Sequence, residues 1–200
     1  ANLAYLSLII FCITTSITPG PNNLLMLLSG VKYGVKASLP HFWGICIGFI
    51  LMVDIVGVGL GELFTHYPII HTIMKYVGAL YMLYLSYKTV FAGDTLNLTK
   101  DNSRKPFTML QGILFQWVNP KAWIMAIGVI ATFTQVNQSI WLQLVPISII
   151  YFIAMIPSVL FWLLGGAGLS KYLANPKHLR VFNWSMGVLL AFSIITIFFE

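Results

Sequence analysis

Hydrophobic side chains occur along this chain in six long runs, separated by short connections that contain most of the polar residues. The runs cover residues 3–28, 41–60, 69–91, 107–133, 140–164 and 181–199. A helix needs about 20 mostly apolar residues to cross the hydrocarbon core of a bilayer, and each run is long enough. The pattern therefore predicts an all-α membrane protein with six transmembrane helices.

The composition excludes a water-soluble domain. Apolar residues make up 58% of the 200 residues and charged residues only 8%, with a mean hydropathy of +0.87. Too few polar side chains remain to cover the outside of a fold, so most of the outside must face lipid. Cys12 and Cys46 lie inside apolar runs and the four histidines lack ligand spacing, so we expect no disulfide, metal or cofactor.

Charge in the connections predicts the orientation of the chain. Lys and Arg are concentrated in the first, third and fifth connections, which places these on the cytoplasmic side and both termini outside. The polar connection at 93–106 divides a single membrane domain into two three-helix units, 1–92 and 107–200. Because each unit has an odd number of helices, the second enters the membrane inverted, as in many secondary transporters.

A helix breaker recurs inside the first helix of each unit. Residues 17–23 read ITPGPNN, and residues 117–121 read WVNPK. Proline inside a helix costs about 3 kcal/mol, and in hydrocarbon the freed backbone groups need protein, water or ligand as partners. Pro21 and Asn119–Pro120 suit new helix starts, so two half-helix N-termini are predicted to face the membrane interior and to attract anions. The alternative is a pair of kinks that only shape packing.

Four charged residues lie inside the apolar runs. Lys75 and Lys88 have long stems that can reach the membrane interfaces, whereas Asp54 and Lys121 lie deeper, where each costs roughly 2.5–3.5 kcal/mol on insertion scales. We predict that Lys121, beside a helix N-terminus, attracts a carboxylate, and that Asp54 meets an ammonium group or carries a coupling proton. Together they would suit a zwitterion. The alternative is a buried Asp54–Lys121 ion pair that only fixes the helix register.

Two motifs, TPGPNNLLMLLSG at 18–30 and QWVNPKAWIMA at 116–126, resemble the LysE/RhtB superfamily of small bacterial amino-acid exporters. The resemblance covers the whole chain and is closest to the branch with cysteine and O-acetylserine exporters. It implies proton-coupled efflux of amino acids or their metabolites across the bacterial inner membrane. Together with the amide of Gln116, the motifs predict a substrate site at Pro19, Gly20, Pro21, Asn22, Asn23, Asn119, Pro120 and Lys121.

The expected mechanism is alternating access, in which two broken helices form one site and the repeats rock around it. One difficulty is geometric: if the first helix begins at Leu3, its break lies past the midplane, so the two breaks would not meet. A channel for small anions or carboxylates is the alternative, since it would use the same helix N-termini. An enzyme is not predicted, because the sequence lacks clustered His, Asp or Glu. Nucleic-acid binding is not indicated either. The pattern leaves open whether the chain forms a homodimer.

Overall fold

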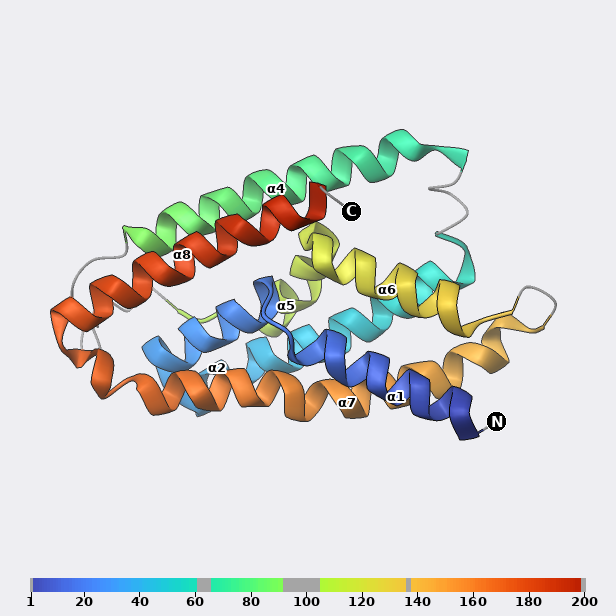
Figure 1. The fold of residues 1–200 in the computed structure, drawn as a ribbon, viewed down its shortest axis with the longest axis horizontal. Helices are drawn as coiled ribbons and strands as arrows, with labels where there is room; N and C mark the ends of the chain where they lie inside the picture. Colours follow the sequence, from blue (N-terminus) through green and yellow to red (C-terminus); the bar gives the residue numbers. More distant parts are fainter. Residues whose placement is uncertain (1, 61–65, 92–104, 136–137, 199–200) are drawn as a thin grey trace.

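The computed structural model describes residues 2–60, 66–91, 105–135 and 138–198, and these residues form helices joined by short connections (Figure 1). This confirms the predicted all-helical class. The helices are α1 (Asn2–Ile17), α2 (Pro21–Ile55) with the π-helical turn η1 (Val56–Leu60), α4 (Pro68–Val90), α5 (Met109–Phe115) with the 3-10 turn η2 (Gln116–Val118), α6 (Pro120–Phe133), α7 (Ile140–Leu169), the 3-10 turn η3 (Tyr172–Ala174) and α8 (Pro176–Phe198).

Two of these helices are long and apolar enough to cross a membrane, namely α2 with its extension to Gly59, and α7. The pair of helical segments Met109–Val118 and Pro120–Phe133, bent by 75° at the break between them, makes a third if it is counted as one span. The described chain therefore has multiple apolar helices and one broken helix pair. The full set of six spans stays a prediction.

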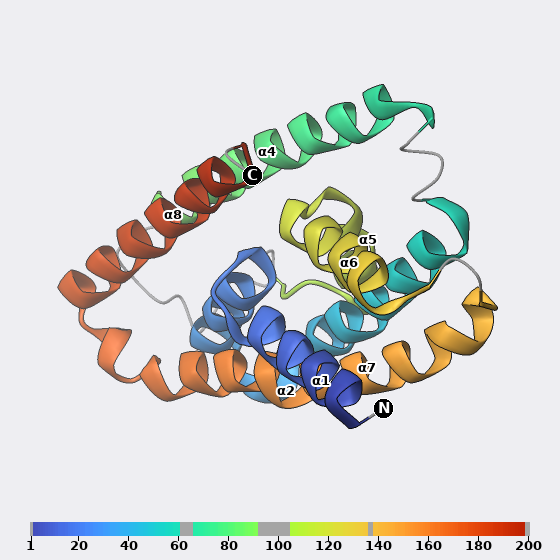
Figure 2. The ribbon, with the colours of Figure 1, turned by 45° about the vertical axis from the view of Figure 1, so that its right-hand side comes forward.

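The first predicted connection is much shorter than expected, because α2 reverses direction at a single residue. Gly34 has φ 81° and ψ 178°, a backbone conformation that glycine adopts without the penalty of a side chain. The parts of α2 before and after it run back alongside each other (Figures 1 and 2). Ser29 Oγ and Ser38 Oγ lie 2.6 Å apart across the turn, which joins the two parts.

Glycines allow the central helices to touch backbone to backbone. A Cβ atom on Gly166 of α7 would lie 2.1 Å from the Leu27 carbonyl oxygen of α2, and one on Gly44 of α2 would lie 2.4 Å from the Met109 carbonyl oxygen of α5. Small residues at such contacts are typical of membrane helices. They hold α2 between α7 and α5, while α4 and α8 pack on each other to one side (Figure 2).

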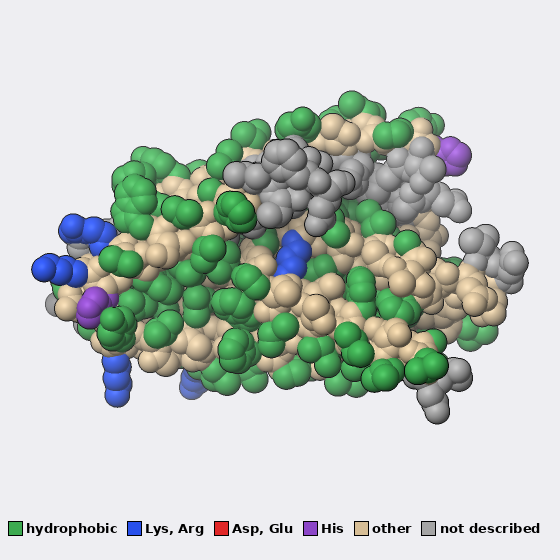
Figure 3. Space-filling view, viewed as in Figure 1, with side chains coloured by type: hydrophobic (Ala, Val, Ile, Leu, Met, Phe, Trp, Pro, Cys, Tyr) green, Lys and Arg blue, Asp and Glu red, His purple; other side chains and the backbone are tan. Residues whose placement is uncertain are grey.

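The surface of the molecule is largely apolar. Figure 3 shows hydrophobic side chains over most of the visible face, with Lys and Arg gathered mainly at the end where α7 leads into α8. Lys171, Lys177 and Arg180 lie in that connection and the first turns of α8. An apolar belt with basic residues at one end suits a protein surrounded by lipid.

The α2–α7 contact gives a stability prediction. Gly166→Ala should lower the free energy of unfolding by about 1–3 kcal/mol, because its methyl group would meet a backbone carbonyl that cannot move alone. Thermal unfolding of the detergent-solubilised protein measures this. Gly168→Ala is the matched control, since nothing lies within 4 Å of a Cβ atom at that position of the same helix. Equal effects of the two substitutions would contradict the close contact.

Candidate functional site

Both predicted helix breaks are present, and each is followed by a new helix start. The first break separates α1 from α2, where Gly20 is the N-cap residue and Pro21 is the first helical residue. The second separates η2 from α6, where Asn119 is the N-cap, with its Oδ1 accepting a hydrogen bond of 3.1 Å from the Lys121 backbone N–H, and Pro120 follows it. The local pattern of Asn or Gly before Pro is sufficient to explain both starts.

The two breaks lie against each other, which removes the geometric difficulty raised by the sequence. Lys121 Nζ donates hydrogen bonds to the carbonyl oxygen of Thr18, at 2.8 Å, and to its Oγ1, at 2.9 Å. Thr18 directly follows the C-terminus of α1, where the helix dipole favours a positive charge. A Cβ atom on Gly20 would lie 2.5 Å from Lys121 Cδ. Glycine at this position therefore leaves the space through which the Lys121 side chain reaches Thr18.

A reciprocal amide pair joins the breaks a second time. Asn22 Nδ2 donates to Gln116 Oε1 at 2.8 Å, and Gln116 Nε2 donates to Asn22 Oδ1 at 3.0 Å. Gln116 Nε2 also donates to the Gly112 carbonyl oxygen at 3.0 Å, and its side chain is completely buried. Buried amides whose donors and acceptors are matched in this way fix the relative position of their helices. Here they tie the start of α2 to the end of α5.

Other side chains satisfy the carbonyl groups that the breaks leave without a helical partner. Asn23 Nδ2 donates to the carbonyl oxygens of Ser16, at 2.7 Å, and Thr18, at 2.8 Å. Trp162 Nε1 donates to the Ile17 carbonyl oxygen at 2.9 Å, and at the second break Trp123 Nε1 donates to that of Trp117 at 2.9 Å. The interrupted backbone is therefore paired within the protein, as an apolar surrounding requires.

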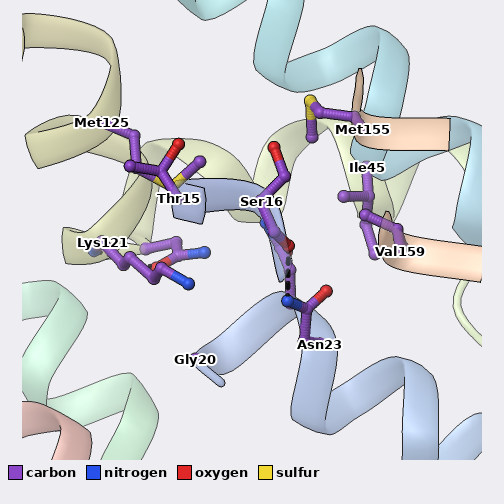
Figure 4. Close-up of a pocket in the computed structure, with 11 residues that line it drawn as sticks. Thr15, Ser16, Gly20, Asn23, Ile45, Lys121, Met125, Met155 and Val159 are labelled. Carbon is purple, nitrogen blue, oxygen red and sulfur yellow. Dashed lines mark hydrogen bonds between the residues drawn. The ribbon is translucent and has the colours of Figure 1, made fainter. Parts of the chain in front are cut away.

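A small cavity, called the central cavity here, lies between the breaks (Figure 4). Its volume, measured as the space that the centre of a water molecule can occupy, is about 20 Å³, which is room for about one water. Its lining residues are Thr15, Ser16, Gly20, Asn22, Asn23, Ile45, Asn119, Lys121, Met125, Met155 and Val159. Five residues of the predicted site are among them. Pro19, Pro21, Gln116 and Pro120 instead shape or tie the surrounding backbone.

Sequence reasoning missed the rest of this lining. Thr15 and Ser16 belong to a run of hydroxyl residues, Thr14–Ser16, inside the apolar helix α1, and that run was an available signal. Four aliphatic or thioether side chains complete the lining, and no signal could have selected them, because the same residue types face lipid elsewhere. They come from α2, α6 and α7, and are Ile45, Met125, Met155 and Val159.

A second and larger cavity, called the terminal cavity here, lies at the end of the molecule that holds the N-terminus (Figure 1). It offers about 640 Å³. The start of α1, the end of α6, the start of α7 and the residues between α6 and α7 line it, through Ala4, Tyr5, Leu8, Phe133, Gln135, Gln138, Ser139, Leu142, Gln143, Pro146 and Ile147.

The residues that line the two cavities lie about two helical turns apart. On α1, Leu8 lines the terminal cavity and Thr15 the central cavity, and seven residues of helix span about 10 Å. On α7, Ile147 lines the terminal cavity and Met155 the central cavity. Between the members of these pairs lie Phe11 of α1 and Tyr151 of α7.

Aromatic rings form a layer between the two cavities. The Phe11 and Tyr151 ring centroids lie 6.4 Å apart, those of Phe11 and Phe133 5.6 Å, and those of Phe49 and Tyr151 4.8 Å, all with edge-to-face geometry. The Tyr151 hydroxyl lies 2.5 Å from Thr15 Oγ1, at the wall of the central cavity. We call Phe11, Phe49, Phe133 and Tyr151 the aromatic layer.

Asp54 lies away from the central cavity. Its Oδ1 accepts a hydrogen bond of 2.5 Å from Ser148 Oγ of α7. Ser148 follows Ile147 of the terminal cavity in the chain but is not itself among the lining residues. Lys121 is held by Thr18 instead. The alternative of a buried Asp54–Lys121 ion pair is therefore wrong: nine residues of α2, about 13 Å of helix, separate Asp54 from Ile45 at the central cavity.

Comparison with known proteins finds relatives over nearly the whole chain. The family of LysE type translocators matches residues 13–197. The uncharacterized membrane protein YrhP of Bacillus subtilis is 26% identical, over 87% of this chain and 88% of the relative. A leucine efflux protein of Klebsiella pneumoniae is 25% identical, over 88% and 85%, and one of Salmonella typhimurium is 26% identical, over 94% and 91%. No solved structure matches at a significant level.

These relatives confirm the predicted family and the prediction that the chain is a transporter and not an enzyme. The narrower likeness to cysteine and O-acetylserine exporters stays a prediction.

The aromatic layer gives a prediction about accessibility. Cys12 follows Phe11 on α1 and is completely buried. Phe11→Ala should open the layer and raise the labelling rate of Cys12 by a small thiol reagent at least several-fold, as measured by peptide mass spectrometry. Phe161→Ala is the control, because that ring is 61% exposed on the outer surface of α7. Unchanged labelling in Phe11→Ala would mean that the ring does not shield Cys12 within the aromatic layer.

Proposed function

The chain belongs to the LysE type translocator family, and we propose that it is a secondary transporter that exports neutral amino acids from the cytoplasm by alternating access. One observation carries the proposal: Lys121 is held between two helix breaks at the wall of the small central cavity. A positive charge beside two helix N-termini favours a carboxylate. The relatives named leucine efflux proteins point to an aliphatic substrate.

The packing of the helices supports two inverted three-helix repeats. The first halves of the broken helices are α1 and α5; α1 packs on α7, and α5 packs on α2. The helices α2 and α7 also pack on each other, as do α4 and α8. Exchanging α1 with α5, the later part of α2 with α7, and α4 with α8 leaves this set of contacts unchanged. Such an arrangement is typical of transporters whose site lies where the repeats meet.

Charge supports the direction of transport. Lys171, Lys177 and Arg180 lie where α7 leads into α8, and Lys32 and Lys36 flank the Gly34 turn, at the same end of the molecule (Figure 1). We propose that this end faces the cytoplasm, with both termini outside, since Lys and Arg are retained on that side. The terminal cavity then faces outward, and the aromatic layer is the outer barrier that opens for release.

Proton coupling at Asp54 is the further part of the proposal. The carboxyl group of Asp54 is hydrogen-bonded to Ser148, and Ile147, which precedes Ser148 in the chain, lines the terminal cavity. We propose that the proton enters from outside on this side of the aromatic layer. Asp54 also directly precedes the end of α2 and the π-helical turn Val56–Leu60. Protonation there can bias the contact between α2 and α7 and thereby the opening of the barrier.

Efflux from proteoliposomes tests the proposed function. Vesicles loaded with labelled leucine, cysteine, O-acetylserine, threonine or lysine should release neutral amino acids with saturable kinetics, faster under an imposed proton gradient. Lys121→Met should lower kcat/KM at least about tenfold, because a hydrogen bond from a charged group is lost. Gly20→Ala, whose methyl group displaces Lys121 from Thr18, should act in the same direction.

Lys36→Met is the matched control for charge, because Lys36 is exposed beside the Gly34 turn, nine residues or about 13 Å of helix from Ile45 at the central cavity. It should transport at the rate of the unmodified protein. Unsaturable flux of many small anions that ignores the gradient would instead favour a channel.

Asp54→Asn tests the coupling step separately. The variant should retain leucine exchange between equal solutions and lose the acceleration by a proton gradient, because an amide cannot carry the proton. Ser148→Ala, which removes the hydrogen-bond partner and leaves the carboxyl group, is the control and should keep the acceleration. Full gradient-driven efflux by Asp54→Asn would exclude this residue as the coupling site.

A further inference from the structure

Two buried acceptor atoms at the central cavity lack a hydrogen-bond partner, namely Ser16 Oγ and Asn23 Oδ1. Both side chains are only 4% exposed. Leaving a buried acceptor unpaired costs about 1–3 kcal/mol, so two such atoms at one cavity point to a donor that binds there.

The orientation of the Asn23 amide is fixed by its other atoms. Nδ2 donates to the carbonyl oxygens of Ser16 and Thr18, and a flipped amide would place oxygen against oxygen at both contacts. Oδ1 is therefore the free end. Figure 4 shows Ser16 and Asn23 between Lys121 on one side and Ile45, Met155 and Val159 on the other.

We propose that Ser16 Oγ and Asn23 Oδ1 bind the α-ammonium group of the substrate, and that the central cavity selects amino acids with neutral aliphatic side chains over cationic ones. This inference rests on the proposed function and adds the contacts that recognise the substrate's ammonium group and side chain.

The positions of the charges match a zwitterion. Lys121 uses two of its three ammonium protons on Thr18, which leaves one for a carboxylate. An α-ammonium group carries only donors, and Ser16 Oγ and Asn23 Oδ1 both have unused lone pairs that can accept from it. Hydrogen bonds of this kind, from a charged group, are about twice as strong as neutral ones.

The remaining lining determines which side chain is accepted. Ile45, Met155 and Val159 form an apolar wall opposite Lys121 (Figure 4). Among the described residues that line the central cavity, Lys121 is the one charged side chain, so a cationic substrate side chain would be repelled and would meet no carboxylate. An aliphatic side chain contacts the wall at no such cost.

The central cavity must enlarge to hold a substrate, since about 20 Å³ accommodates roughly one water molecule. Met125 and Met155 are its most adaptable lining residues, because methionine is unbranched and has three rotatable bonds in its side chain. Ser16 Oγ and Asn23 Oδ1 have almost no accessible surface in this structure, so the substrate ammonium group would reach them as the cavity enlarges.

The test compares ligands that differ by one group, as competitors of labelled leucine in proteoliposome exchange. The ligands are leucine, 4-methylpentanoate, which is leucine without its ammonium group, and lysine. For the unmodified protein, we expect leucine to compete at least about tenfold better than either of the others. Equal competition by 4-methylpentanoate overturns the ammonium site, and equal competition by lysine overturns the selection of neutral side chains.

Ser16→Ala is the decisive variant, because it removes an atom that makes no hydrogen bond within the protein and so should leave thermal stability unchanged or raised. It should weaken competition by leucine about ten- to hundredfold and leave that of 4-methylpentanoate unchanged. Thr14→Ala removes an exposed hydroxyl two residues away and serves as control.

Failure of this inference can be distinguished from failure of the proposed function. If Ser16→Ala weakens both ligands equally, or neither, the ammonium assignment is wrong while leucine transport stands. If the unmodified protein exchanges no amino acid of the panel, the proposed function itself fails.

Discussion

Backbone groups at the two helix breaks must find partners inside an apolar protein, and the rest of the structure depends on this constraint. Each break removes hydrogen bonds of a helix, which lipid cannot replace. The breaks supply each other: Lys121 binds Thr18 at the end of α1, and Asn22 pairs with Gln116 at the end of α5. Because each break needs the other, the four helical segments around them have one defined arrangement.

Glycines allow the two helix breaks to approach each other and allow the surrounding helices to pack tightly against them. Gly20 leaves room for the Lys121 side chain, and Gly166 and Gly44 bring α7 and α5 into backbone contact with α2. Polar groups are therefore concentrated at the centre, while long apolar side chains face outward. This distribution produces a small polar cavity, separated by the aromatic layer from a larger cavity at one end.

Local features could be predicted from the sequence because they depend on neighbouring residues. The helix starts at Pro21 and Pro120 follow from the preference of proline for the first helical position, and Asn119 caps its helix as its residue type predicts. The reversal at Gly34 was less predictable, since the surrounding residues look like a longer loop. Asp54 stood out in the sequence as a charge inside an apolar run, but its partner Ser148 is 94 residues away.

The sequence by itself determined a helical membrane protein of the LysE type translocator family with two interrupted helices and a lysine at the second interruption. Apolar length and proline chemistry act over a few residues, so these properties can be derived from the order of residues alone. Only the tertiary structure decided that the breaks meet, that Lys121 binds Thr18 and not Asp54, and that Ile45, Met155 and Val159 line the cavity while similar residues face lipid. Contacts between residues about 100 positions apart depend on how the helices pack. The type of an apolar side chain does not show whether it will face the cavity or the lipid.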